Sequence, residues 1–413
     1  MPGLHRKGNQ CTTKFLDIEM SKFFYTYLFV VETLLLLSGC KKPYAPSVTT
    51  ATNSFLVVEG MINTGADSTI IHIAHTIPLS APTGTLPPPE LNAGVVVESD
   101  ANATYPLTDA GNGYYVSSGL NLSATNKYRL KITTSGNTVY ESDFVPVKNS
   151  PPIDSVNYMF NSDGLDIHVS THDPSNSTRY YRWSYDETWI IHSNFDSFEE
   201  LHKVPFDTIL PRPLEDQIYQ CWQNHRSNVI VLGSTAALTQ DIISQTKLTS
   251  IATGSEKVAN RYSILVKQYA LTPDAFNYWQ QLKKNTEQLG SIFDPQPSEI
   301  QGNIHSVSNP SESVVGYISA GSVSQKRIFI DIRDLPSWPP ITDNGCKTDT
   351  LLFVGKGGNN EVRDFLYLEN QIPISSITLR PGGPIIGYSA GTPECVDCTL
   401  RGSNKPPAFW TNQ

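Results

Sequence analysis

From Phe55 to Val145 the chain alternates between short apolar or β-branched runs and residues that favour turns. Glycine, asparagine, aspartate or proline separates most of the runs, as between the strands of an antiparallel sheet. About seven short strands at this spacing predict a β-sandwich of about 100 residues, which we place at residues 55–148. The expected strands are Leu56–Met61, Ser68–Ala74, Gly94–Glu98, Ala103–Leu107, Gly113–Val116, Lys127–Thr133 and Thr138–Val145.

A second, larger β-rich domain is expected over residues 151–413. The double proline Pro151-Pro152 marks its start, because two prolines stop a strand and favour an extended linker. The segment 166–170 alternates between polar and apolar residues, and the segment 180–189 has the composition of a strongly aromatic strand. Together the two regions predict a mainly all-β protein.

One main α-helix is expected in the second domain, over about residues 273–289. Thr272 suits the N-cap, Pro273 the first helical position and Gly290 the position just beyond the end. Apolar residues recur between them at three- and four-residue steps, which predicts one buried face. That face would contain Phe276, Trp279, Leu282, Thr286 and Leu289.

The start of the chain has the layout of a signal peptide. Residues 23–37 form a mostly apolar run, preceded by Lys22 and followed by the small residues Ser38 and Gly39. A transmembrane helix is the alternative. However, the run is shorter than the about 20 apolar residues that cross a bilayer, and it contains Glu32.

The tetrad Leu37-Ser38-Gly39-Cys40 resembles the lipobox of bacterial lipoproteins, in which the cysteine carries lipid. We therefore expect residues 1–39 to be removed, with Met20 as an alternative start, and lipidation at Cys40. A Pro-, Ser- and Thr-rich tether over residues 40–54 would follow. The folded domains would then lie outside the cytoplasm on a membrane surface of the cell envelope, and they could face the periplasm or the outside.

Composition narrows the possible partners. The full chain has a formal net charge of −9, which becomes −10 when four basic and three acidic residues leave with residues 1–39. Nucleic-acid binding depends on clustered Lys and Arg, so this charge argues against a nucleic-acid partner.

Four cysteines remain after Cys40, namely Cys221, Cys346, Cys395 and Cys398. An even count in an oxidising compartment favours disulfides. The favoured pairing is Cys395–Cys398 as a local loop and Cys221–Cys346 as a long one. A zinc site built on the C-x-x-C spacing is the alternative.

Three patterns in the sequence are candidates for catalytic or metal sites. Gly387-Tyr388-Ser389-Ala390-Gly391 matches G-x-S-x-G, but the last histidine is His305, whereas a nucleophile elbow needs a later histidine. A glycine-rich turn is the preferred interpretation. The pair Asp186-Glu187 could serve glycoside hydrolysis only at a defined carboxyl separation, and a solvated strand end is the simpler interpretation. The nine scattered histidines lack ligand spacing, so no metal and no cofactor is expected.

Aromatic residues concentrate in the first half of the second domain. Core packing is favoured for them, because alternate strand positions must fill a sandwich interior. If one row faced outward, it would suit sugar or peptide binding. The binding candidates are Tyr181, Trp183, Tyr185 and Trp189.

Several ordered motifs make the chain resemble the domain-of-unknown-function 4249 family (DUF4249) of Bacteroidota lipoproteins. The first domain is also similar to transthyretin-like and Ig-like sandwiches, which is a likeness of fold alone. The family implies an outer-membrane lipoprotein beside a TonB-dependent receptor, and it supplies no functional residue. The motifs are Val57–Gly60, Pro152–Val156, Tyr180–Trp183, Cys221-Trp222, Arg261–Tyr269, Gly290–Pro297, Gly302–Ile304, Val315–Tyr317 and Cys395–Gly402.

The leading functional hypothesis is a non-enzymatic binding protein that assists a TonB-dependent outer-membrane transporter, with an unknown ligand. It follows from the anchor, the all-β composition and the missing catalytic pattern. A secreted hydrolase of peptide or glycan is one alternative, with an acidic pair as catalyst. An adhesion or envelope-structure protein is the other.

Overall fold

The computed structural model describes residues 54–78, 80–202, 208–287, 300–336, 338 and 345–411. The predicted signal peptide, the alternative start at Met20, the lipidation site Cys40 and nearly all of the tether lie outside these residues. Among the described residues, no helix is both long enough and apolar enough to cross a membrane.

The predicted N-terminal strands are present, and the mainly all-β fold is confirmed. Strand β4 pairs with β3 through its first half and with β5 through its second half, so it connects the two halves of one curled sheet. Alternate residues point into a core that contains Val97, Tyr115 and Leu130. The last predicted strand is divided in two. The strands are β1 (Leu56–Asn63), β2 (Thr69–His75), β3 (Gly94–Ser99), β4 (Thr104–Gly111), β5 (Tyr114–Ser117), β6 (Lys127–Thr133), β7 (Val139–Ser142) and β8 (Val145–Pro146).

A later part of the chain returns to complete this first sheet. Strand β18 (Ile304–Ser306) pairs with β7, and β19 (Ala320–Gly321) pairs in parallel with β1. Between them, the Asn303 side chain accepts from Ile318 N and donates to Ile318 O, at 2.8 and 2.9 Å. Residues on both sides of the double proline at 151–152 therefore share one core.

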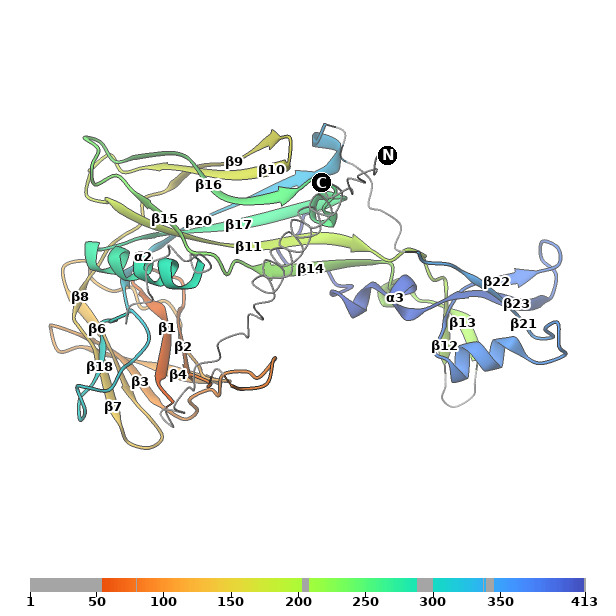
Figure 1. Cartoon of the computed structure of the whole chain (residues 1–413), viewed down its shortest axis with the longest axis horizontal. Helices are drawn as coiled ribbons and strands as arrows, with labels where there is room; N and C mark the ends of the chain where they lie inside the picture. The colour runs from red at the N-terminus through yellow and green to blue at the C-terminus, as the bar shows by residue number, and fades with distance from the viewer. Residues whose placement is uncertain are drawn as a thin grey trace, which may run out of the picture. The chain divides into compact units, whose positions relative to one another are not determined.

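The second region is a sandwich of two sheets whose facing side chains form the largest core (Figure 1). One sheet has the order β16-β10-β9, and the other has the order β14-β11-β17-β20 with β15 also paired to β11. Strand β11 is the predicted aromatic strand and is central in its sheet. The bounds are β9 (Ile153–Asn161), β10 (Gly164–His172), β11 (Tyr180–His192), β14 (Gln220–Arg226), β15 (Val231–Ser234), β16 (Ile242–Ala252), β17 (Arg261–Ala270) and β20 (Val323–Asp331).

Helix α2 (Pro273–Glu287) confirms the main predicted helix, whose last predicted residues lie outside the described part. The Thr272 hydroxyl accepts from Ala275 N at 3.2 Å, as expected of an N-cap. Ala275 and Tyr278 are the buried residues of the helix, whereas Thr286 is exposed, so the predicted buried face is rotated. In Figure 1 the helix lies on the side of β11 opposite to β9, β10 and β16.

The C-terminal part adds a small three-stranded sheet of order β21-β23-β22, and a hairpin of β12 and β13 from the middle of the chain packs with it (Figure 1). These elements have two small cores of their own. The bounds are β12 (Glu199–His202), β13 (Thr208–Pro211), β21 (Asp349–Leu352), β22 (Ile372–Thr378), β23 (Ile385–Gly391) and α3 (Pro393–Val396), with 3-10 turns at Leu214–Asp216, Glu256–Val258, Ile332–Asp334 and Cys398–Leu400 and a π-helical turn at Arg363–Leu368.

The cysteines form two disulfides, but the predicted pairing is wrong. Cys221 is bonded to Cys398, and Cys346 is bonded to Cys395, with Cα atoms 5.7 Å apart in both. Cys398 N donates to Ile218 O, which holds Cys398 beside Cys221. Cys395 belongs to α3 and faces a different neighbour. With all four thiols bonded in this way, the zinc alternative is also wrong.

The two sheets of the second sandwich are joined by a tight connection between β10 and β11. The Asp173 carboxylate accepts five hydrogen bonds there, from the amides of Ser175, Ser177 and Thr178 and from the hydroxyls of both serines, at 2.6–3.0 Å. Burial alone would raise the pKa of Asp173, but these donors hold it well below its ordinary value.

We predict that Asp173→Asn lowers the free energy of unfolding at pH 7 by about 1–3 kcal/mol, because several donors lose their acceptor. The folded pKa is depressed, so this stability is present above the unfolded pKa of about 3.9 and is lost as pH falls through the folded pKa. The deficit of the variant should therefore shrink as the pH falls below about 4.

Urea unfolding of both proteins across the acidic range measures the deficit. Asp100→Asn, a change of equal charge at an exposed turn, serves as the control. A deficit that stayed constant from neutral to acidic pH would contradict the assigned role of Asp173.

Candidate functional site

A cleft of about 630 Å³ lies beside the start of β14, where the C-terminal tail passes the chain before β12. It falls in the size range of typical ligand sites, about 300–1,000 Å³. Its walls come from residues 196–198, from residues 212–220 and from the C-terminal tail. The lining residues are Asp196, Ser197, Phe198, Arg212, Pro213, Leu214, Glu215, Gln217, Tyr219, Gln220, Asn404, Lys405 and Pro406.

Gln217 fixes the middle wall of the cleft. Its side-chain oxygen accepts from Tyr219 N and Gln220 N, at 3.0 and 2.8 Å, and its amide donates to Gln220 O at 2.7 Å. Asn404 from the C-terminal tail donates to Gln217 O at 2.9 Å. The polar atoms of Gln217 thus hold two segments together and are not directed at a ligand.

Arg212 fixes the opposite wall. Its guanidinium donates to the Ser197 carbonyl and to the Glu199 carbonyl, at 3.2 and 3.0 Å, and lies 3.5 Å from the Glu200 carboxylate. Burial lowers the pKa of Arg212, and Glu200 partly offsets this effect. The arginine therefore links the chain just after β13 to the first residues of β12 and to the chain before β12.

The two disulfides sit directly behind these walls. The Cys395 carbonyl accepts from Asn194 N and Phe195 N, at 2.9 and 3.2 Å, and Cys398 is bonded to the first buried residue of β14. The core at this place is small, with three buried members, Ile218, Ile374 and Val396. Small cores need such covalent links to hold a defined shape.

The side chains left to meet a ligand are mostly apolar. Leu214 is 86% exposed and Phe198 is 62% exposed, both at the rim of the cleft. Tyr219 is stacked on His192 with ring centroids 4.6 Å apart, which fixes its orientation. Large exposed apolar groups on a rigid frame are typical of a binding surface.

The hydroxyl of Ser197, which lines the cleft, is not activated as a nucleophile. Ser197 donates to the main-chain carbonyls of Glu199 and Pro373, at 2.9 and 2.7 Å, and accepts from Arg212. A nucleophilic serine would instead donate to a base. The hydrogen bonds of Ser197 therefore hold the wall of the cleft together.

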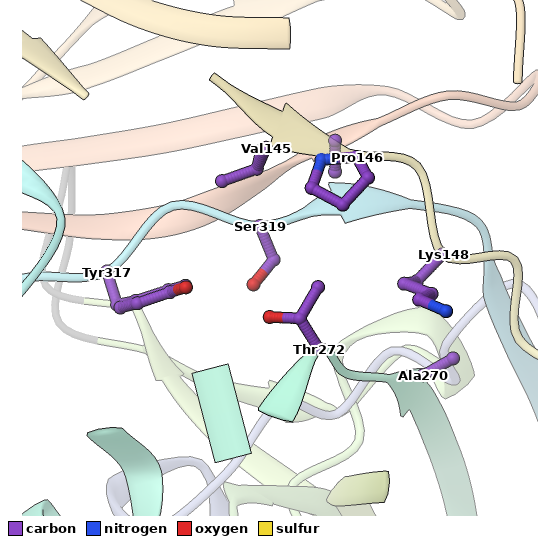
Figure 2. Close-up of a pocket in the computed structure, with 8 residues that line it drawn as sticks. Val145, Pro146, Lys148, Ala270, Thr272, Tyr317 and Ser319 are labelled. Atoms are coloured by element: carbon purple, nitrogen blue, oxygen red, sulfur yellow. The ribbon is translucent and has the colours of Figure 1, made fainter. Parts of the chain in front are cut away.

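A second, narrower crevice lies beside the N-terminus of α2. Figure 2 shows Tyr317, Ser319 and Thr272 pointing toward it, below Val145 and Pro146. It has no room even for a water molecule, so it is a packing seam and not a ligand site.

The four aromatic binding candidates lie in the core. Tyr181 and Trp183 are fully buried, and Tyr185 and Trp189 nearly so. Trp183 Nε1 donates to Gln268 Oε1 at 2.9 Å, and the Tyr181 hydroxyl donates to Asp241. The binding interpretation of this row is wrong, and the favoured core interpretation holds, because odd-numbered positions of β11 face the other sheet.

The alternation of side chains along β11 also separates the candidate acidic pair Asp186 and Glu187. Neighbouring residues of a strand point to opposite faces, so Asp186 lies on the outer face, while Glu187 is only 2% exposed in the interior. These two carboxyls cannot flank one glycosidic bond.

Glu187 is instead held by three partners. Tyr262 donates to it at 2.8 Å, while Lys257 Nζ and His225 Nδ1 lie 2.7 and 2.9 Å from its other oxygen. Burial and the neighbouring carboxylate raise the pKa of Tyr262 well above its ordinary value. The cluster therefore satisfies the buried charge of Glu187.

The G-x-S-x-G segment is not a nucleophile elbow. Residues 385–391 form the middle strand β23 of its sheet, so the preferred glycine-rich turn is also wrong. A Cβ on Gly387 would lie 2.1 Å from Leu351 O, so glycine allows the close approach of β21. Among the described residues, no group of three or more His, Cys, Asp or Glu side chains is placed to hold a metal ion.

A family model described as domain of unknown function (DUF4249) matches residues 41–327. The chain belongs to this family. Comparison with curated proteins gives no match. The DUF4249 match ends within β20, so the tail motif Cys395–Gly402 and the cleft residues Asn404, Lys405 and Pro406 lie beyond it.

The cleft residues were missed from the sequence. Phe198, Leu214 and Tyr219 stand in segments without clear periodicity. The tail completes the cleft because it returns beside β14, where Trp222 pairs with Ser403. One feature of the sequence could have pointed to the cleft. Arg212 stands between two prolines, which favour a fixed, exposed loop.

We predict that Lys257→Met lowers the free energy of unfolding by about 2–3 kcal/mol, because it leaves the buried Glu187 charge short of a partner. Lys247→Met is the matched control. Lys247 lies 2.8 Å from Asp166, a carboxylate that is more exposed than Glu187, so the cost should stay below about 1 kcal/mol.

Guanidinium unfolding followed by tryptophan fluorescence measures both variants, since Lys257 lies over the Trp189 ring at 5.1 Å. An equal loss of unfolding free energy in the two variants would contradict the prediction, because it would show that the burial of Glu187 does not strengthen its ion pair with Lys257.

Proposed function

We propose that this DUF4249 protein is a lipid-anchored, non-enzymatic binding protein of the outer membrane that works beside a TonB-dependent transporter. The observation that carries the proposal is the open cleft with Phe198 and Leu214 at its rim. We expect this cleft to bind an extended, partly apolar segment of the transporter.

The anchor supports the membrane part of the proposal. The segment Leu37–Cys40 has the lipobox order, and the family match begins at residue 41, directly after the cysteine. Lipidation at Cys40 would keep the chain at the membrane surface, where an integral transporter is a natural neighbour. The partner class rests on the resemblance to outer-membrane lipoproteins.

The chemistry of the cleft supports binding over catalysis. Its strongest polar groups, on Gln217, Arg212 and Ser197, are engaged with the protein itself. The exposed groups are a phenyl ring, a leucine and prolines, together with the rim charges Glu215 and Lys405. Such a surface gains affinity by burying apolar area and fixes its ligand by shape.

We predict that the double variant Phe198→Ala, Leu214→Ala reduces recovery of the transporter at least tenfold. Each side chain would contribute about 1.5–3 kcal/mol if fully buried on binding, and 1.4 kcal/mol corresponds to a factor of ten. The measurement is purification of the full chain from detergent-solubilised native membranes, with TonB-dependent barrels quantified by mass spectrometry.

Leu86→Ala, Leu379→Ala is the control, since these leucines are 83% and 78% exposed at other places. It should recover the transporter as well as the unchanged chain does. Failure of the unchanged chain to recover any such barrel, or equal recovery by the cleft variant, would refute the proposal.

A further inference from the structure

The outer face of the β14-β11-β17-β20 sheet carries a concentration of positive charge. The strand register places even-numbered residues of β11 beside odd-numbered residues of β17 and β20 on this face. Trp279 of α2 covers one end, and the tail residues Phe409 and Trp410 cover the other. Five cationic side chains share this face with only two carboxylates: Arg182, Arg226, Arg261, Lys267 and Arg327 against Asp186 and Asp331.

Arg182 is the central feature of this face. Its guanidinium lies between the rings of Tyr269 and Trp279, at 4.3 and 4.1 Å from their centroids. Its Nε is buried without a hydrogen-bond partner, and no carboxylate in the described part of the chain pairs with the guanidinium. Burial lowers the pKa of Arg182, yet an arginine stays charged in proteins.

A guanidinium stacked between two rings is fixed in place, while the edge of its plane can still bind an anion. Carboxylate, sulfate and phosphate oxygens match its fork of donors. Because both rings already fix the side chain, a ligand would lose little additional rotamer freedom there.

Two further cations extend the line from Arg182. Lys267 is the diagonal neighbour of Arg182, and Arg327 is the diagonal neighbour of Lys267, so successive positions are about 7–8 Å apart. Lys267 lies 2.6 Å from Asp186, whereas Arg327 donates to the Ser263 hydroxyl at 3.0 Å and stacks over Phe409 at 3.5 Å. The row therefore offers repeated positive charge between aromatic rings.

We propose that this face binds an acidic polysaccharide, with a carboxylate or sulfate group of the sugar chain at the Arg182 guanidinium. The chain as a whole is acidic, with a formal net charge of −9, so a local excess of cations is a feature of this face and not of the composition. The rings of Tyr269, Trp279 and Phe409 border these charges, and each turns one face to a guanidinium and so fixes it in place.

A glycan fits this face better than an acidic peptide does. An extended peptide usually gains affinity by pairing its main chain with a free strand edge. Strands β11 and β17 are paired on both sides, so their main-chain groups are used. Sugar hydroxyls could instead reach the side chains of Ser184, Gln325 and Asn224, which lie on the same face.

The test is isothermal titration of the full chain in detergent with four polymers: polygalacturonate, dextran sulfate, neutral dextran and polyglutamate. We expect binding of one or both acidic glycans, weakened by salt, and no comparable binding of the other two polymers. Arg182→Met keeps an unbranched side chain between the rings but removes the charge. It should weaken glycan binding about tenfold or more, the loss expected for one charge-assisted contact.

Arg380→Met removes the same charge from the exposed loop between β22 and β23 and should leave the affinity unchanged. The cleft variant Phe198→Ala, Leu214→Ala should also keep it, so this proposal and the proposed function fail independently. If Arg182→Met loses the native circular dichroism spectrum, Arg327→Gln carries the test and should weaken binding severalfold.

Three outcomes would overturn the proposal. One is full affinity in a natively folded Arg182→Met protein, or in Arg327→Gln where that variant carries the test. Another is binding of neutral dextran or polyglutamate as tightly as the acidic glycans, which would assign the face to neutral sugars or to peptides. The last is no binding of either acidic glycan.

Discussion

The alternation of side chains along β11 is the constraint on which the second region depends. This strand of thirteen residues is hydrogen-bonded to β14 and β15 on one side and to β17 on the other. Its odd-numbered positions from Tyr181 to Ile191 fill the core, and its even-numbered positions form the outer face. A shift of one residue would bury Arg182 and Asp186 and expose Trp183 and Glu187, so the register is strongly specified.

The C-terminal elements are held together by a different principle. Their cores are small, and covalent links and hydrogen-bonded side chains replace apolar burial there. Both disulfides join segments distant in the sequence, with separations of 177 and 49 residues. Cys221–Cys398 ties the tail to the end of β14, and Cys346–Cys395 ties it to the segment before β21. The cleft lies where these links meet, so its shape is fixed before any ligand arrives.

The sequence predicted those elements whose pattern is local. The strands of the first sandwich, the aromatic strand β11 and helix α2 each follow from residues adjacent in the chain. The disulfide pairing failed because the C-x-x-C spacing suggested a local loop, whereas Cys395 and Cys398 belong to two successive helical turns and face different partners. The return of β18 and β19 to the first sheet, and the meeting of Phe198 with Asn404, depend on long-range folding that no local pattern encodes.

The residues Asp186 and Glu187 suggest a catalytic pair, but each of them serves a separate ion pair. As neighbours in the sequence they look like a catalytic pair, but the pleat gives each a separate environment. Inside, Glu187 pairs with Lys257 and is also held by Tyr262 and His225, which stabilises the strand from the core side. Asp186 remains outside beside Lys267, where it leaves the guanidinium of Arg182 without a carboxylate. The same backbone that buries one charge therefore holds the outer cations in fixed positions, so that a ligand meets a surface already ordered by the core beneath it.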